Sequence, residues 1–374
     1  LLPTLLMSLF LLASMQSAEA ETVFKSEEHR FHLTEIAGGL NHPWGFAFLP
    51  GGDILITERA GDLRIVRAGK LEEKPITGLP KDVFVSGQGG LLDIALHPKF
   101  SETKLVYISY AAGRRLKAGT QVLRAKLIGS RLEKVEVIFK ANTKTPGTAH
   151  YGSRLQFAAD GTLFITIGDR YDRLHDAQNT ANHLGAVIRI NDDGTVPKDN
   201  PFVGKPGFAP EIYSYGHRNP QGLTVHPETR TIWLHEHGPL GGDEVNILKP
   251  GANYGWPAIT YGIDYSGASI SDKNHAPGME QPIIHWSPSI APSGMAFYSG
   301  DKFPGWKGSL FIGALAKRHL RRLEMKGDRV VGEEKLLEGM ARFRDVRQGP
   351  KGYLYVLTDS SEGKLLRLEP VNGK

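Results

Sequence analysis

The sequence predicts an all-β fold, a six-bladed β-propeller with long loops over its active-site face. A short apolar strand, a turn with Gly, Pro or Asp, and a second apolar strand recur six times along the chain. The copies start roughly 45 to 70 residues apart, a spacing that indicates a radial array of repeated units. No long amphipathic helix separates them, and 44 glycines and 23 prolines fit a chain rich in turns. A two-sheet sandwich, the alternative, would not need a unit that recurs at this spacing.

Each copy supplies two neighbouring strands of one predicted blade. The strand pairs are 44–48 with 54–57, 91–96 with 105–110, 154–157 with 163–167, 221–225 with 231–234, 293–297 with 310–315, and 344–348 with 353–358. In a propeller the first strand of each pair lines the central channel, and ring closure protects the strand edges. The stretch Asn253–Ser287 has few strand signals. We interpret it as a long loop over the active-site face, because long loops in compact domains are usually functional.

The first twenty residues have the pattern of a cleaved secretory signal. Leu1–Ala13 is mostly apolar, and Ala18-Glu19-Ala20 is a small-x-small cleavage site. The basic segment that normally precedes such a run is absent, so we expect the natural start to lie upstream. A transmembrane anchor is the alternative, although the run is shorter than the ~20 apolar residues that a span needs. We therefore expect residues 21–374 to form a single propeller domain, exported to the periplasm, with no membrane span.

The composition excludes several kinds of chemistry. The chain contains no cysteine, which excludes a cysteine nucleophile, a zinc–thiolate centre and its own c-type haem. The stability of an exported chain without disulfides must come from its core, from metal or from closure of the fold. The formal net charge of +5 is mild and spread along the chain, so nucleic acid is not an expected partner. A local positive funnel for an anionic ligand is compatible with this charge.

The segment Ser214–Gly222 reads as a rigid turn that presents hydrogen-bond donors. It places a histidine, Arg218 and Asn219 between two glycines and a proline. The planar fork of an arginine suits a carboxylate or a quinone oxygen. The alternative interpretation is an arginine that bridges two blades.

A second turn, His235–Glu244, offers hard oxygen ligands. The Gly238-Pro239 turn and the carboxylate of Glu244 suit Ca²⁺ better than a transition metal. Tyr254 lies in a further turn that is rich in free carbonyls. Zinc bound by His235 and His237 is a weaker alternative, because no third ligand is evident.

Further polar residues stand at the entries of other predicted inner strands. His150 precedes the third copy, and a histidine there is the natural base because its pKa lies near neutral pH, although a structural histidine is the alternative. Gln88 lies in a Gly-rich turn before the second copy. Arg342 and Arg344 enter the sixth copy on one strand face, where they need a shared anion or acidic neighbours. In a propeller these entries converge on one mouth of the channel.

Together these segments resemble the soluble glucose/sorbosone dehydrogenases, exported six-bladed propellers that use pyrroloquinoline quinone (PQQ). The likeness is greatest to the bacterial aldose sugar dehydrogenases. It extends from about Leu40 to Leu368, nearly the whole of the predicted mature chain. Its most specific parts are 215–222, 238–256 and 342–346, in that order.

The resemblance implies the oxidation of an aldose at C1 to a lactone. His150 would take the proton of the anomeric hydroxyl as the C1 hydride passes to the quinone, and electrons would then go to an external acceptor. The cofactor-binding residues implied are Gln88, Arg218, Asn219, Tyr265, Lys317, Arg342 and Arg344. The carbonyls of Gly238 and Pro239 would bind the cofactor's Ca²⁺, while Glu244 and Tyr254 would form a second, structural Ca²⁺ site.

Two positions depart from the pattern of the family's glucose enzymes. An ungapped reading puts Ala316 where those enzymes carry a cofactor lysine, and Lys317 reaches that position only by a one-residue shift, which reverses its strand face. Ala149 stands before the base, where those enzymes have an acid. The alternatives are a Ca²⁺-dependent propeller lactonase or hydrolase, and an exported carbohydrate-binding propeller without catalysis. The sequence leaves open the sugar, the electron acceptor and whether the protein is a monomer or a homodimer.

Overall fold

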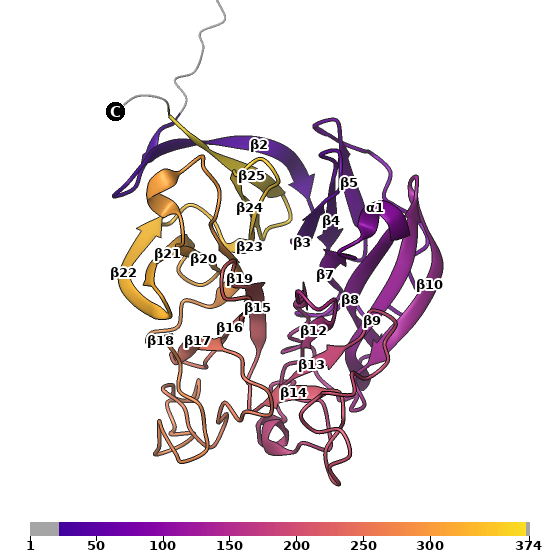
Figure 1. The fold of residues 1–374 in the computed structure, drawn as a ribbon, viewed down its shortest axis with the longest axis vertical. Helices are drawn as coiled ribbons and strands as arrows, with labels where there is room; N and C mark the ends of the chain where they lie inside the picture. The colour runs from indigo at the N-terminus through magenta and orange to yellow at the C-terminus, as the bar shows by residue number, and fades with distance from the viewer. Residues whose placement is uncertain (1–21, 372–374) are drawn as a thin grey trace, which may run out of the picture.

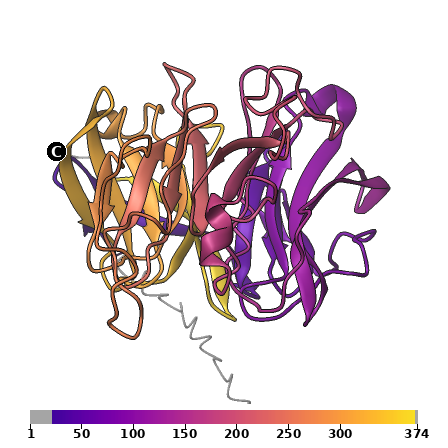
Figure 2. The same ribbon diagram turned by 90° about the horizontal axis from the view of Figure 1, so that it is seen from below.

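Six β-sheets stand around a central axis and form a closed ring. The computed structural model describes residues 22–371. In Figure 1 the chain runs around the ring in order, with the innermost strands pointing along the central axis. Figure 2 shows the sheets from the side, standing next to one another with loops at both ends. The six-bladed β-propeller predicted from the repeat is confirmed, while the predicted signal segment lies outside the described residues.

Each blade is an antiparallel sheet, and its first strand lies at the channel while the later strands follow in order toward the outside. The first blade is β3 (Pro43–Phe48), β4 (Ile54–Glu58), β5 (Leu63–Arg67) and β6 (Lys70–Leu71), and the second is β7 (Leu91–Leu96), β8 (Leu105–Arg114), β9 (Lys117–Ile128) and β10 (Arg131–Lys140). The third is β11 (Leu155–Phe157), β12 (Leu163–Thr166), β13 (Ala186–Ile190) and β14 (Ile212–Tyr215), and the fourth is β15 (Pro220–Val225), β16 (Ile232–Glu236), β17 (Asp243–Ile247) and β18 (Ile284–Trp286). The fifth is β19 (Pro292–Phe297), β20 (Leu310–Ala314), β21 (His319–Lys326) and β22 (Arg329–Leu336). Short helices α1 (Phe100–Thr103), η1 (Leu174–Gln178) and η2 (Pro304–Trp306) lie in connections.

The sixth blade closes the ring with strands from both ends of the described chain. It orders β1 (Phe24–Lys25), β2 (Arg30–Leu40), β25 (Gly363–Pro370), β24 (Leu354–Thr358) and β23 (Phe343–Gln348). Strand β2 pairs antiparallel with β25, so that Phe31 lies opposite Pro370. Figure 1 shows this as the indigo β2 lying along the yellow β25.

All six predicted strand pairs are the two inner strands of their blades, and their ends agree within two residues except at β8, which continues four residues beyond the predicted end, to Arg114. Within Asn253–Ser287 the structure has one short strand, β18, so the predicted excursion is largely a loop. No helix of residues 22–371 is long and apolar enough to cross a membrane.

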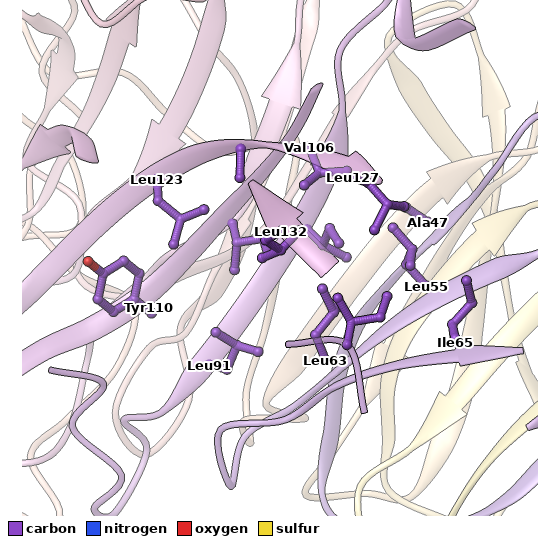
Figure 3. Packing of buried hydrophobic residues seen from close by; sticks show 14 of the residues in the cluster. Ala47, Leu55, Leu63, Ile65, Leu91, Val106, Tyr110, Leu123, Leu127 and Leu132 are labelled. Carbon is purple, nitrogen blue, oxygen red and sulfur yellow. The ribbon is translucent and has the colours of Figure 1, made fainter. Parts of the chain in front are cut away.

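Apolar side chains fill the spaces between adjacent blades. Figure 3 shows the largest cluster, where Leu55 and Leu63 of the first blade meet Leu91, Val106 and Leu123 of the second. These five side chains have no more than 1% of their surface exposed. Full burial of one such side chain contributes roughly 1.5–3 kcal/mol relative to exposure. Each blade is therefore held mainly by its neighbours.

A buried charge network crosses the central channel. Asp93 and Asp345, from opposite sides of the first blade, both contact Arg154 and Arg347. The Arg347 guanidinium lies 2.5 Å from an Asp93 oxygen and 2.8 Å from an Asp345 oxygen. Burial raises the pKa of Asp345, and the two arginines counteract that effect. These four charges tie together inner strands of three blades.

Candidate active site

His150 is held at the channel mouth by a chain that turns sharply before β11. Its φ is 52°, and the following Gly152 also has a positive φ of 61°. Gly168 permits the close approach of this turn, because a Cβ there would lie 2.4 Å from the His150 carbonyl oxygen. The end of β12 and the entry of β11 therefore lie side by side, which brings Asp169 to the histidine.

His150 and Asp169 form a hydrogen-bonded pair. Nδ1 of His150 donates to Oδ1 of Asp169 over 2.7 Å, and the indole Nε1 of Trp256 donates to Oδ2 over 2.8 Å. The backbone N–H of Tyr171 adds a third hydrogen bond to the carboxylate. Because an ionised carboxylate can only accept, the proton of a neutral His150 sits on Nδ1 and the lone pair of Nε2 is free. This is the tautomer that a general base requires.

The electrostatic surroundings keep both members of this pair in the state that a base needs. Burial lowers the pKa of His150 below its ordinary value, although Asp169 acts in the opposite direction. Burial also opposes ionisation of Asp169, but the hydrogen bond and charge of His150 outweigh it and lower the pKa of that carboxyl. At neutral pH the pair is thus a neutral imidazole beside a carboxylate.

Gln88 contacts the same histidine. Its Oε1 accepts a hydrogen bond from the backbone N–H of His150 over 2.8 Å, and its own N–H donates to the Thr148 carbonyl. Gly87 has a φ of 58°, and a Cβ there would meet Thr148 within 3 Å. The glycine-rich turn therefore packs against the loop that carries His150.

Arg218 is fixed by the turn between β14 and β15. Its backbone N–H donates to Glu236 over 2.5 Å, and its Nη1 donates to the Gly238 carbonyl over 2.8 Å. The neighbouring His217 donates from Nδ1 to the same carboxylate and accepts from Ser214. The predicted turn is confirmed, and it presents Arg218 to the side of the channel mouth where His150 lies.

Asn219 has a donor without a partner. Its Oδ1 accepts from the Gly152 N–H over 3.1 Å, but its buried Nδ2 has no hydrogen bond to any residue that the structure describes. The side chain is 1% exposed. A buried amide left unpaired is costly, so this atom indicates a ligand acceptor at this place.

Arg342 and Arg344 share one carboxylate on the sixth blade. Asp359 lies 2.7 Å from Nη2 of Arg344 and 3.6 Å from Nη2 of Arg342. Burial opposes ionisation of Asp359, but Arg344 and His42 outweigh it and lower the pKa of that carboxyl. The Nε of Arg344 is buried without a partner among residues 22–371. An acidic neighbour thus exists, and donor capacity remains for an anion.

These two arginines face a cavity of about 210 Å³ at the channel mouth. Its lining consists of Trp44, Arg59, Gln88, Gln221, His237, Ala291, Leu315, Arg342 and Arg344. Burial lowers the pKa of His237 to about 3, so this ring is neutral and donates from Nε2 to the Pro292 carbonyl. The cavity therefore offers cations and hydrogen-bond donors.

Glu236 and Glu244 stand directly opposite each other on strands β16 and β17. Both line a small cavity of about 10 Å³, together with Tyr254, whose carbonyl accepts no hydrogen bond within residues 22–371. That volume is about one water-sized sphere. Burial and the charge of Glu236 raise the pKa of Glu244 to about 8. The Glu236 oxygens already accept from His217 and the Arg218 backbone, so a hard cation such as Ca²⁺ would be bound mainly by the Glu244 carboxylate and the free Tyr254 carbonyl.

The Gly238-Pro239 turn borders both the small cavity and a larger one. The Gly238 carbonyl accepts from Arg218, and its N–H donates to Asp243 over 2.9 Å. The Asp243 carboxylate also accepts from Ser289 and from the backbone of Ile290, so its oxygens are already occupied. Within the described part of the chain, no group of three or more His, Cys, Asp or Glu side chains forms a metal site. A cation here would depend on carbonyl oxygens, and zinc gains no support.

Tyr265 lies at the rim of a cavity of about 480 Å³. Its ring stacks on Tyr171 at 6.3 Å and lies 5.9 Å from the Arg218 guanidinium. Tyr171 in turn packs edge-on against His150 at 5.2 Å. The predicted excursion therefore reaches the face that holds the base.

Lys317 lies apart from these cavities. It is exposed in the turn after β20, and the residue of this turn that lines the arginine cavity is Leu315. Ala316 is exposed as well. The cofactor role of Lys317 stays a prediction without a contact in its favour.

Asp169, Trp256, Asp359, Arg59 and His237 belong to the site but were not predicted as site residues. Four of them follow the end of a second strand: β4, β12, β16 or β24. In an antiparallel pair, the end of the second strand lies beside the start of the first. Residues that follow the end of a second strand are therefore site candidates in the same way as residues at the entry of a first strand.

The residues present fit PQQ. PQQ carries three carboxylates and an o-quinone, and the arginine cavity supplies cations and the unpaired Nε of Arg344, while a second unpaired donor, Nδ2 of Asn219, belongs to a side chain that contacts the His150 turn at Gly152. Trp44 adds an aromatic wall to this cavity. The cavity thus offers hydrogen-bond donors and cations, which suit an anionic, planar ligand.

Fold and site define a six-bladed propeller with a histidine–carboxylate pair and an arginine-lined cavity at one channel mouth. A model of the glucose/sorbosone dehydrogenase family matches residues 40–367. The chain is 45% identical to the aldose sugar dehydrogenase YliI of Escherichia coli over 340 residues, 89% of this chain and 91% of that protein. The chain belongs to the glucose/sorbosone dehydrogenase family.

Solved structures agree with this assignment. The apo form of the soluble aldose sugar dehydrogenase from E. coli superimposes with a TM-score of 0.88 at 43% identity, covering 91% of this chain and all of that one. The PQQ-bound form of an aldose sugar dehydrogenase from Streptomyces coelicolor gives a TM-score of 0.73 at 29% identity, covering 91% and 98%.

Proposed function

We propose that this protein is a PQQ- and Ca²⁺-dependent aldose dehydrogenase that oxidises the C1 hydroxyl of an aldose to a lactone. The observation that carries the proposal is the His150–Asp169 pair, 2.7 Å apart, next to the arginine cavity. Membership of the family supports sugar oxidation. When bound, PQQ would supply the two-electron oxidant of the sugar, and an external acceptor would reoxidise it.

The residues of the chain divide into three roles in this proposal. His150 removes the proton of the anomeric hydroxyl through Nε2, and Asp169 stabilises the imidazolium that forms. Arg218 and Asn219 donate to the quinone, while Arg342 and Arg344 hold carboxylates of the cofactor. The excursion covers part of the site and helps to exclude water, since Trp256 donates to Asp169 and Tyr265 lies at the rim near Arg218.

Calcium has two roles in the proposal. One ion at the Gly238 and Pro239 carbonyls would polarise the quinone, and the Gly238 carbonyl, which accepts one hydrogen bond from Arg218, keeps a second lone pair for it. A second, structural ion at Glu244 and the Tyr254 carbonyl would relieve the repulsion between Glu236 and Glu244.

The first experiment is dye-linked aldose oxidation by purified apoprotein with Ca²⁺, before and after PQQ is added. Activity that depends on PQQ would establish the reaction, and a panel of aldoses would rank the substrates. A saturable PQQ spectral change without activity would mean that the sugar or the acceptor is wrong. The absence of both activity and PQQ binding would favour the lactonase or the carbohydrate-binding propeller.

We also propose export to the periplasm, because Leu1–Ala20 has an apolar core and a small-x-small cleavage site. The mass of the protein from a periplasmic extract tests this. A mature chain that starts at Glu21 agrees with the proposal, and an uncleaved chain in the cytoplasm contradicts it.

A further inference from the structure

The arginine cavity contains a cation that the family resemblance did not assign. Arg342 and Arg344 come from the entry of β23 in the sixth blade, whereas Arg59 follows β4 in the first blade. The three side chains reach one cavity of about 210 Å³ from two neighbouring blades. Arg59 is thus well placed to contact the same ligand as Arg342 and Arg344.

The guanidinium of Arg59 is free. It makes no hydrogen bond or ion pair with any residue of the described part of the chain, although it is half-buried. Arg342 and Arg344 both contact Asp359, and Arg344 also donates to Gln221. Burial lowers the pKa of Arg59, Asp359 opposes this effect, and Arg344 and Arg342 add to it. Arg59 therefore lies close to two positive charges without an anionic partner of its own.

Asp359 balances the charge of Arg59 only in part, because burial and the two other arginines together outweigh it. Asp359 accepts from Arg344 over 2.7 Å and from His42 over 2.8 Å, which leaves Arg59 without a direct contact to it. No acidic side chain is among those that line the cavity. An anionic ligand would therefore gain from all three arginines.

The backbone of Arg59 is fixed beside the loop that carries Gln88. Its N–H donates to the His42 carbonyl, and its carbonyl accepts from Leu91. Gly90 has a φ of 146°, and a Cβ there would lie 1.9 Å from the Arg59 carbonyl oxygen. Only glycine permits this approach, so the Gly-rich turn and Arg59 form one packed unit at the mouth.

We propose that Arg59 is a cofactor-binding residue that holds a carboxylate of PQQ, as the third arginine of this cavity. The proposal rests on the proposed function. PQQ has three carboxylates, and a planar guanidinium binds a carboxylate through two parallel hydrogen bonds.

Titration of the Ca²⁺-loaded apoprotein with PQQ tests this without any turnover. Tryptophan fluorescence and absorbance report binding, since Trp44 lines the cavity. We expect Arg59→Gln to weaken PQQ binding about ten- to a hundredfold, the usual effect of one charge-assisted hydrogen bond. Arg59→Lys should recover part of the loss, because it keeps the charge but not the fork. Arg115→Gln, at the exposed tip of the β8–β9 hairpin, removes the same charge and should bind PQQ as the wild type does.

The outcomes separate this proposal from the proposed function. Equal PQQ affinity of the wild type and Arg59→Gln overturns the role of Arg59 alone. A wild type that shows no saturable PQQ binding overturns both proposals. Thermal unfolding and Ca²⁺-dependent stabilisation of each variant should match the wild type. If Arg59→Gln does not fold, the PQQ affinity of Arg59→Lys, compared with the wild type, tests the proposal. A folded Arg59→Lys that binds PQQ no better than a folded Arg59→Gln would reduce Arg59 to a role in shape rather than charge and so overturn the proposal.

Discussion

The imidazole of His150 donates to the carboxylate of Asp169 over 2.7 Å, across 18 intervening residues and between the two innermost strands of one blade. Trp256, from the excursion after the fourth blade, binds the second carboxylate oxygen. The base is therefore oriented by two segments that are remote in sequence. Its environment can be tested apart from cofactor binding.

Replacement of His150 by alanine should remove turnover but not the cofactor. We expect kcat to fall about 10²- to 10⁴-fold, the usual contribution of a general base. The PQQ affinity should change little, because His150 hydrogen-bonds Gln88 through its backbone. Steady-state dye reduction and PQQ titration give the two values. Full activity of this variant would refute the assignment of the base.

Replacement of Asp169 by asparagine should alter the pH dependence. The wild-type kcat/KM should fall as the pH drops through the pKa of His150, which burial places below 6.5. Because Asp169 raises that pKa, its loss should lower it further and move the acid limb to lower pH. Activity at neutral pH should also fall, roughly ten- to a hundredfold, as one charged hydrogen bond is lost. An acid limb that moves upward or stays in place would contradict this account.

Calcium should stabilise the protein through Glu244. At a free Ca²⁺ concentration a hundred times its Kd, binding to the folded state adds about 2.7 kcal/mol to the free energy of unfolding. Glu244→Gln should remove this gain, yet without Ca²⁺ it should unfold no more easily than the wild type, because repulsion from Glu236 disappears. Thermal unfolding with and without a chelator measures both effects. If Ca²⁺ still stabilises the Glu244→Gln variant, the ion binds at a site other than Glu244.

Tyr265 should contribute through its ring face. Tyr265→Ala should weaken PQQ binding, whereas Tyr265→Phe should retain it, since the hydroxyl has no hydrogen bond within residues 22–371 and the ring faces Arg218 and Tyr171. The two Kd values from PQQ titration decide. An unchanged Kd for Tyr265→Ala together with a raised KM would instead assign this ring to the sugar.

The charge network of the channel should be costly to break. Asp93→Asn leaves Arg347 and Arg154 with one buried carboxylate between them. Removal of one partner from a buried pair typically costs about 3–5 kcal/mol of stability. Denaturant unfolding should show this loss, and Asp301→Asn, an exposed acid in a surface loop, should stay near the wild type. A loss below about 1 kcal/mol would contradict the view that both carboxylates are needed to hold the two buried arginines.

The inner strands could be predicted because each has an apolar run and a turn signal within a few residues. The outer strands gave no such signal: β6 has two residues, and β10 is largely exposed, with the pattern of a solvated surface. Strand β18 follows a long loop and has only three residues. Closure by β2 and β25 depends on pairing between the ends of the described chain, which no local pattern reports.

The site was predicted in part for a similar reason. His150, Arg218 and Arg344 stand where an inner strand begins, and such strand entries converge on one channel mouth in a propeller. Asp169 and Arg59 stand where the second strand ends, at the same mouth of the channel. Their sequence neighbours carry no unusual motif, so only the antiparallel geometry of the pair reveals them.

The pairing of β2 with β25 also sets the order of events in folding. The sixth blade lacks β25, the strand that joins β2 to β24, until Gly363–Pro370 has been synthesised, so the ring closes only after the other five blades have been made. Before that point the chain contains all strands of the other five blades, but the sixth sheet is not complete. Until β25 pairs with β2, this sheet does not link the two ends of the ring.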